Sequence, residues 1–351
     1  MDAFIHSGLI TMPTVILVII VAGMLYVLSK GADILVDQAV GLSVQWGVPK
    51  MVIGATVVSL GTTLPEASVS VLAAVNGNPD LALGNAIGSI IADTGLIIGL
   101  AALIGYLPVD RIIVKRQGKI QVAAGFLLAL VSIPFFSASH GNISQWMGWI
   151  FIGLLVLYIY FSIKWARNSA LAGIEPAAGK PSAKTKNSVP EPAVQKKPLI
   201  IRMLKLFCGI ALVIVSSKIL IPAVEITAVR VGIPQSIIAA TLVALGTSLP
   251  ELVTAVTAVR KGHGELAVGN IVGADILNVL FVVGSSAAVT SGGLNVPVDF
   301  YKLQIPAMLV ILVVFRLFSR GNNERITKIE GSVLLTVYIA YIILNYTWLR
   351  T

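Results

Sequence analysis

The chain has almost none of the residues that build soft-metal or nucleophilic sites. It contains one cysteine, Cys208, and three histidines, His6, His140 and His263. A single cysteine excludes a disulfide within the chain and a thiolate metal cluster, and the histidines are too dispersed for a histidine metal site. An intramembrane hydrolase needs an activated nucleophile with a base or a metal. Neither of the acidic motifs described below has a histidine or cysteine near it that could serve in this way. We therefore expect a protein that is not an enzyme and that has no cofactor.

Charged residues are also scarce. They make up 12% of the 351 residues, whereas 56% are hydrophobic and the mean hydropathy is +0.92. A soluble domain needs more polar surface, so the composition predicts an all-α polytopic membrane protein. Helices of about 20 apolar residues cross a hydrocarbon core of about 30 Å. The ten predicted transmembrane spans are 13–42, 50–76, 80–106, 119–137, 145–164, 202–226, 233–259, 264–290, 297–317 and 328–348.

Acidic residues are fewer than basic ones, 16 against 25, which gives a net charge of +9. In the ten-span arrangement, 20 of the 25 basic residues lie in loops on one side of the membrane. The positive-inside rule makes that side cytoplasmic and places both termini outside. The chain has no basic helix and no alternation of aromatic and basic residues, so nucleic acid is not an expected partner. We expect an integral protein of the plasma (inner) membrane, surrounded by lipid bilayer; its oligomeric state stays open.

The chain divides into two related halves. Residues 166–197 are rich in Ala, Pro, Lys, Ser and Gly without apolar periodicity, which predicts a flexible cytoplasmic linker between halves 1–165 and 198–351. Residues 47–99 and 232–284 align at a constant offset of 185 with 22 identities in 53 positions. Because each half has an odd number of spans, the second enters the membrane from the opposite side. We therefore predict two inverted five-helix repeats, an architecture of many secondary transporters.

The repeated segments contain an unusual acidic motif. Residues 61–66 read Gly-Thr-Thr-Leu-Pro-Glu and residues 246–251 read Gly-Thr-Ser-Leu-Pro-Glu, each inside an apolar span. A carboxylate in such a span costs roughly 3 kcal/mol on insertion scales, so it predicts a functional site. Pro65 removes the helical donor for the carbonyl of Gly61, and we expect the chain to unwind at this glycine. The second copy repeats the pattern.

Each motif places a hydroxyl and a carboxylate on one helix face. Thr62 and Glu66 are four residues apart, as are Thr247 and Glu251. Hydroxyl, carboxylate and carbonyl oxygens are hard ligands that suit Ca²⁺ or Na⁺ better than soft transition metals. Two copies that converge midway through the bilayer can supply the 6–8 oxygens that Ca²⁺ takes.

A second motif follows each acidic motif. Residues 84–89 read Gly-Asn-Ala-Ile-Gly-Ser and match Gly-Asn-Ile-Val-Gly-Ala at 269–274. Ser89 and Asp93 share a helix face, and Asn278 takes the position of Asp93 in the second repeat. We expect Asp93 to be the third carboxylate of the site and Asn278 to be a neutral oxygen donor. The asparagines of the second motif are expected to bond helix to helix, and the role of Asp275 stays open.

These paired motifs resemble the sodium/calcium exchanger family of the cation/Ca²⁺ antiporter superfamily. Its signature is a pair of inverted repeats, each with a Gly-Thr-Ser-Leu-Pro-Glu-like and a Gly-Asn-x-x-Gly-Ser-Asn-like motif. The resemblance implies exchange of several Na⁺ for one Ca²⁺ by alternating access, with the first and sixth spans sliding across a fixed core. It implies that Glu66 and Glu251 are the shared carboxylates. The implied hydroxyl or carbonyl ligands are Thr62, Thr63, Thr247, Ser248 and Ser89. The carbonyls of Ser59 and Ala244 are implied to close the outlying Na⁺ sites.

The chain departs from the family pattern in the second motif. Prokaryotic exchangers that it resembles commonly end the first repeat in Asn and the second in Asp, whereas here Asp93 and Asn278 invert that order. Ala274 replaces an expected serine and removes one hydroxyl ligand. The total charge is retained, so we expect Ca²⁺ binding, but H⁺ or K⁺ remains an alternative to Na⁺ as the coupling ion. A passive cation channel is a competing class, for which a sealed cluster of hydroxyls and carboxylates is less suited.

Overall fold

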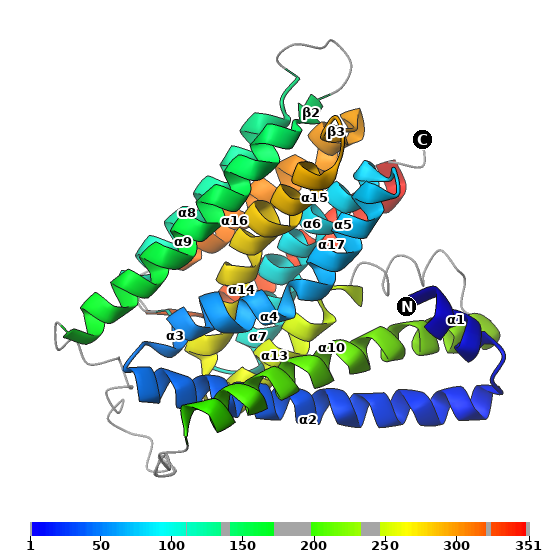
Figure 1. Ribbon diagram of the computed structural model, residues 1–351, viewed down its shortest axis with the longest axis horizontal. Coiled ribbons are helices and arrows are strands. Elements are labelled where there is room, and N and C mark those ends of the chain that lie inside the picture. Colours follow the sequence, from blue (N-terminus) through cyan, green and yellow to red (C-terminus); the bar gives the residue numbers. More distant parts are fainter. Residues whose placement is uncertain are drawn as a thin grey trace.

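The protein is almost entirely helical (Figure 1). The computed structural model describes residues 2–109, 111–134, 141–171, 198–232, 246–320 and 324–348. Long helices alternate with rows of shorter segments that stack end to end through π-helical turns. The last helix of the first half runs to Leu171, past the predicted start of the linker, and the rest of that linker lies outside the described residues.

The first half begins with a short helix and a long one. The long helix, α2, ends at Gly47, whose φ of 64° is the left-handed conformation that glycine adopts readily. The elements of this half are α1 (Asp2–Ile10), α2 (Thr14–Trp46), α3 (Lys50–Ile53), η1 (Gly54–Val58), α4 (Ser59–Thr62), α5 (Leu64–Val75), α6 (Pro79–Ile91), η2 (Ala92–Ile97), α7 (Ile98–Ile104), β1 (Leu107–Pro108), α8 (Arg111–Ser132), β2 (Gly141–Ile143) and α9 (Gln145–Leu171).

The second half follows the same order of long helix, broken rows, strand and closing helices. Its long helix, α10, is followed by Gly232, which has a φ of 86° and occupies the position of Gly47 in the repeat. The described elements of this half are α10 (Leu199–Arg230), α13 (Leu249–Arg260), α14 (Gly264–Leu277), η4 (Asn278–Val283), α15 (Gly284–Val289), β3 (Leu294–Val296), η5 (Phe300–Gln304), α16 (Ile305–Phe318), β4 (Arg325–Ile326) and α17 (Lys328–Trp348).

Several helices are long and apolar enough to cross a membrane. The described residues contain seven, or eight if the bent pair Lys50–Thr62 and Leu64–Val75 counts as one span. The chain is therefore a helical membrane protein, and the count of ten stays a prediction. At the predicted span 119–137, α8 has Arg116 and Lys119 in its first half, which shortens its apolar run. The predicted span 233–259 is described only from residue 246 onward.

The helix breaks at the first acidic motif, as the sequence predicted, but at a different residue. The two parts of the row are bent by 44° at a break that falls on Thr63. Pro65 lies in the first turn of α5, where its missing N–H is tolerated. Gly61 stays helical in α4, so the expectation that the chain unwinds there is wrong. A Cβ on Gly61 would lie 2.5 Å from Ile210 Cδ1, so this glycine instead permits the close approach of α10.

The two long helices, α2 and α10, lie side by side and run across the direction of most other helices (Figure 1). Their backbones approach closely, because a Cβ on Gly31 would lie 2.9 Å from Leu212 Cβ. Arg202 of α10 is buried in this contact and donates from Nε to Gln45 Oε1 of α2 at 3.0 Å. The close packing and the buried polar contact join α2 and α10 into one layer.

The halves exchange equivalent contacts. β1 pairs antiparallel with β4, and β2 pairs antiparallel with β3. In each half, one strand follows the third helical row and the other precedes the last helix. In the same way α7 packs on α17, and α15 packs on α9. A two-fold relation between the halves would produce this exchange, which supports the predicted repeat; the inverted orientation in a membrane stays a prediction.

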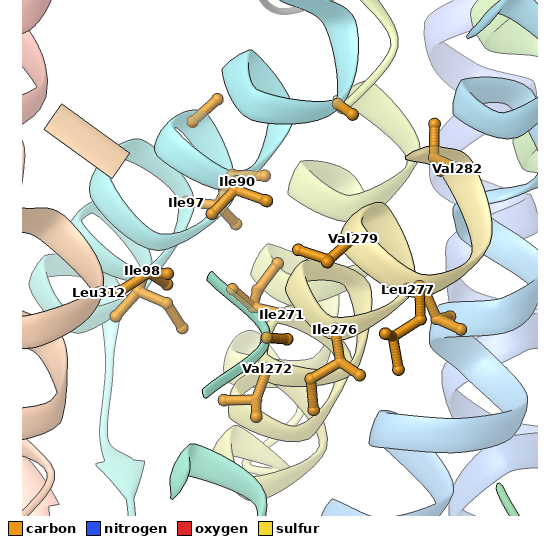
Figure 2. Close-up of a cluster of buried hydrophobic side chains, with 14 of the residues drawn as sticks. Ile90, Ile97, Ile98, Ile271, Val272, Ile276, Leu277, Val279, Val282 and Leu312 are labelled. Carbon is orange, nitrogen blue, oxygen red and sulfur yellow. The ribbon is translucent and has the colours of Figure 1, made fainter. Parts of the chain in front are cut away.

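The rows that carry the second motifs occupy the centre. In the most apolar stretch of the span Gly264–Val289, 94% of the residues are buried, and in that of Pro79–Ile104 the share is 72%. Figure 2 shows the apolar cluster between them, with Ile90 and Val279 from opposite rows. In the most apolar stretches of α2 and α17, only 22% and 17% of the residues are buried, so most of their apolar side chains can face the surrounding lipid.

Candidate functional site

The two acidic motifs meet in the interior. Ser248 of the second motif donates from Oγ to Glu66 Oε1 of the first at 2.9 Å. Glu66 and Glu251 are both 0% exposed, and their side chains interact electrostatically with each other. The structure thus brings together, at one buried locus, two segments that the sequence separates by 185 residues.

Matching hydrogen bonds cross between the halves at this locus. Thr247 donates from Oγ1 to Asn85 Oδ1 at 3.0 Å, and Thr62 donates from Oγ1 to Asn270 Oδ1 at 3.4 Å. The two bonds occupy equivalent positions of the repeat. The asparagines therefore bond helix to helix as expected, and they orient the hydroxyls of the acidic motifs. Asn85 also donates from Nδ2 to Ser70 Oγ at 3.0 Å, which holds its amide in place.

Several buried oxygens at the locus accept no hydrogen bond from the described part of the chain. They include Glu66 Oε2 and both carboxylate oxygens of Glu251 and of Asp93, and the Thr63 hydroxyl is also without a partner there. An ionised carboxylate buried without compensation costs several kcal/mol. These oxygens are hard donors of the kind that Ca²⁺ and Na⁺ take as ligands. The arrangement is therefore chemically suited to hold a cation.

Asp93 and Asn278 lie at equivalent π-helical turns. Asp93 is in η2, and Asn278 is the first residue of η4. Both side chains are fully buried, and neither has a hydrogen-bond partner among the described residues. Because π-turns interrupt the regular helical ladder, they occur frequently at functional sites. The third predicted carboxylate and its neutral counterpart thus lie in the same local structure on opposite halves.

The remaining predicted ligands differ in their surroundings. Ser89 Oγ lies 3.5 Å from Thr247 Oγ1, next to the second motif. The carbonyl of Ser59 accepts the Thr63 amide at 2.9 Å, and it lies 3.3 Å from the Thr62 hydroxyl, whose single proton is shared with Asn270 Oδ1. Ala244 lies outside the described residues.

The acids do not form a closed cage of their own. Within the described ranges, no group of three or more His, Cys, Asp or Glu side chains is placed to hold a metal ion. Any cation at this locus would therefore need hydroxyl, amide or carbonyl oxygens in addition to carboxylates. The Thr, Ser and Asn side chains around Glu66 are the groups that can supply them.

A further buried polar group escaped the sequence argument. Asp275, whose role the sequence left open, accepts hydrogen bonds at Oδ2 from Thr94 Oγ1 and from Gln121 Nε2, each at 2.5 Å. The signal in the sequence was Gln121 itself, a polar residue inside a predicted span. The sequence could not pair it with Asp275, because 154 residues separate them.

Comparison with known proteins places the chain in a family. The sequence model of the sodium/calcium exchanger protein family matches residues 16–164 and 202–347. The chain belongs to this family. Its members are membrane transporters and not a family of catalytic enzymes, which agrees with the resemblance that the paired motifs indicated.

Relatives match nearly the whole chain. Inner membrane protein YrbG of Escherichia coli (strain K12) is 33% identical over 335 residues, which cover 94% of this chain and 96% of that protein. Sodium/calcium exchanger MaX1 of Methanosarcina acetivorans is 29% identical and covers 95% of this chain and 99% of its own length. The structure of the sodium-calcium exchanger NCX_Mj soaked with 2.5 mM Na⁺ and 1 mM Sr²⁺ matches with a TM-score of 0.74 at 25% identity, over 93% of this chain and 97% of that one.

Proposed function

We propose that the protein is a secondary antiporter that exchanges Na⁺ for Ca²⁺ by alternating access. Ca²⁺ and Na⁺ are its substrates, and they bind at the locus where the two acidic motifs meet. Glu66 and Glu251 are the shared carboxylates, Asp93 adds a third charge, and Asn278 is a neutral donor. Hydroxyls and carbonyls complete the site; the proposed ligands of this kind are Thr62, Thr63, Thr247, Ser248, Ser89, Ser59 and Ala244.

The contact between Ser248 and Glu66 is the observation that carries this proposal. It joins a hydroxyl of one motif to the carboxylate of the other at 2.9 Å, while Glu251 and Asp93 keep buried oxygens without partners among the described residues. A site made only for packing would leave no such oxygens, because each carries the full desolvation penalty. Membership of the exchanger family and the match to NCX_Mj support the same function.

The coupling follows from charge. Buried carboxylates at one locus repel each other, so the empty site is costly to move past a low-dielectric barrier. One Ca²⁺ or several Na⁺ can bind the same acids and offset most of their charge, and the two ions therefore compete. The unloaded protein rarely changes access. After it releases Ca²⁺ on one side, the site therefore returns to the other side only when Na⁺ occupies it, and this couples the two fluxes. We infer that the α2–α10 layer slides across the core to expose the site to each side in turn.

The proposed arrangement in the membrane keeps the inverted repeats. Residues 1–165 and 198–351 form the two five-span halves, the 166–197 linker is cytoplasmic, and both termini are outside. The excess of basic residues on one side supports this orientation. The match to an inner membrane protein of E. coli supports a location in the plasma (inner) membrane.

Transport by the purified protein in proteoliposomes tests the coupling ion. Vesicles loaded with Na⁺ and diluted into choline buffer should take up radiolabelled Ca²⁺ saturably, whereas vesicles loaded with choline should not. Matched vesicles loaded with K⁺, or carrying only a pH gradient, separate the alternatives. Uptake driven by K⁺ or by the pH gradient alone would overturn Na⁺ coupling. Single-molecule currents in a planar bilayer would overturn antiport itself, since exchangers turn over too slowly to be resolved.

A further inference from the structure

Asp275 is a buried acid that the proposed exchange site does not use. It is 2% exposed and lies on α14, in the span Gly264–Val289, whose most apolar stretch is 94% buried. No Lys, Arg or His of the described chain forms an ion pair with it. Since a buried carboxylate without a compensating charge costs several kcal/mol, its retention in a membrane span needs a reason.

The hydrogen bonds to Asp275 engage only one of its two carboxylate oxygens. Thr94 and Gln121 both donate to Oδ2, and Gln121 Nε2 lies 3.5 Å from Thr94 Oγ1. Asp275 Oδ1 and Gln121 Oε1 have no partner among the described residues. Gln121 is 1% exposed, and its amide nitrogen touches the carboxylate, so its unpartnered oxygen is held beside the same group.

The surroundings of this group are negative. Asp275 interacts electrostatically with Glu66, and Asp93 interacts electrostatically with Asp275. One Ca²⁺ at the exchange site balances only two of the three charges of Glu66, Glu251 and Asp93, so none of its charge is left to balance Asp275. Its hydrogen-bond donors are neutral, so they reduce the cost of the charge without balancing it.

The mirrored position in the other half shows that packing does not require these polar groups. At the repeat offset of 185, Asp275 corresponds to Ile90 and Thr94 corresponds to Val279. Both of these residues are buried and belong to the apolar cluster of Figure 2. The fold therefore accommodates an apolar pair at one position and a carboxylate with a hydroxyl at its counterpart.

We propose that Asp275, Thr94 and Gln121 form a second cation site, which takes a monovalent metal ion, Na⁺ or K⁺, beside the exchange locus. The group itself contains one carboxylate, which balances one positive charge. Carboxylate, hydroxyl and amide oxygens are the hard donors that alkali cations accept. The site goes beyond the proposed exchange function and does not depend on which ion drives Ca²⁺ transport.

Thermal unfolding of the full-length protein in detergent tests this site. The background variant Glu66→Gln with Glu251→Gln removes the shared acids of the exchange locus. In Ca²⁺-free buffer of constant ionic strength made up with choline, NaCl or KCl should still raise its Tm saturably, because a ligand of the folded state stabilises it. Adding Asp275→Asn should raise the half-saturating salt concentration by about a hundredfold or more, since it removes the charged ligand of a buried ion.

Two variants on α8 separate binding from folding defects. Gln121→Leu should raise the half-saturating concentration about tenfold, as expected for one lost polar ligand. Gln117→Leu is the matched control: Gln117 is buried one turn earlier and donates to Ser162 Oγ at 3.4 Å, so the salt response should not change. If Asp275→Asn does not fold, Gln121→Leu decides the question.

The outcomes distinguish this site from the exchange function. An unchanged salt response in Asp275→Asn, or in Gln121→Leu, overturns the second site. A background variant that responds to pH but to neither Na⁺ nor K⁺ also overturns it, because the group then holds a proton. Failure of Na⁺-driven Ca²⁺ uptake, with the Asp275-dependent salt response intact, overturns only the exchange function. The more effective of NaCl and KCl identifies the ion.

Discussion

The two acidic motifs have nearly the same sequence but different surroundings. Glu66 accepts a hydrogen bond from Ser248, whereas neither carboxylate oxygen of Glu251 has a partner among the described residues. Thr63, which corresponds to Ser248, keeps a hydroxyl without a partner there. The repeat therefore brings equivalent groups to one locus, while the contacts between the halves decide what each group bonds to.

The second motifs differ in charge as well as in contacts. The first half has its acid at Asp93, with Ile90 one turn earlier, and the second half has its acid at Asp275, with Asn278 one turn later. Each half thus contributes one carboxylate from this row, but at a different position. If these differences matter, matched substitutions in the two halves should have unequal effects.

The largest effect is expected where the halves are most alike. Glu66→Gln and Glu251→Gln should each lower Ca²⁺ uptake in proteoliposomes by about a hundredfold or more, because each removes a buried charge that balances the ion. Glu265→Gln is the matched control. Glu265 lies outside the proposed site and forms an ion pair with Lys50, in which Oε1 is 3.3 Å from Lys50 Nζ. Strong uptake by either site variant, with the protein folded and reconstituted, would contradict the assignment.

Exchanging the second-motif residues tests whether charge or position matters. Asp93→Asn should raise the Ca²⁺ concentration for half-maximal uptake by about tenfold or more, because one of three charges is lost. Adding Asn278→Asp restores the charge at the equivalent π-turn and should recover most of the affinity. An affinity that stays unchanged in Asp93→Asn would assign this residue to the scaffold.

The Ser248–Glu66 bond should make the halves unequal. A hydrogen bond to a charged group is worth about 1.5–3 kcal/mol, so Ser248→Ala should weaken apparent Ca²⁺ affinity by roughly tenfold or more. Thr63→Ala, at the equivalent position without such a bond, should have a smaller effect. Concentration-dependent uptake measures both, and equal losses would show that the asymmetry does not persist when the ion is bound.

The last comparison concerns stability and the glycines that open the motifs. A Cβ on Gly61 would lie 2.5 Å from Ile210 Cδ1, whereas one on Gly246 would lie 3.4 Å from Ile221 Cδ1. Gly61→Ala should therefore destabilise the protein by about 1–3 kcal/mol, the usual cost of overpacking, and Gly246→Ala by less. Chemical denaturation in detergent compares them, and a larger loss for Gly246→Ala would reverse the argument.

Much of the site could be predicted because the duplication is written in the sequence. Two nearly identical runs around Glu66 and Glu251 inside apolar segments predict an intramembrane site from the sequence alone. The asparagines of the second motif were expected to bond between helices, and the structure places Asn85 on Thr247 in that way. The sequence also predicts a helix break within the first motif, since proline removes a donor wherever it occurs in a helix, although the break falls on Thr63.

What the sequence missed depends on contacts between distant segments. The sequence predicts unwinding at Gly61, but its contact with Ile210 from the other half gives it a packing role. The sequence assigns no role to Asp275, whose role depends on its contacts with Thr94 and Gln121. The contacts of Asp275 alone join residues from three separate helical rows, and no periodicity within one row contains that information.

The sequence by itself determined that the chain is a membrane protein with two related acidic motifs, because hydropathy, duplication and buried charge are local properties. Only the tertiary structure decided which oxygens bond and which keep no partner in the described chain. Side chains of both halves compete for the same donors, and that competition is settled by packing. Ser248 reaches Glu66 but Thr63 does not bond to Glu251 in the same way, although the two hydroxyls occupy equivalent positions.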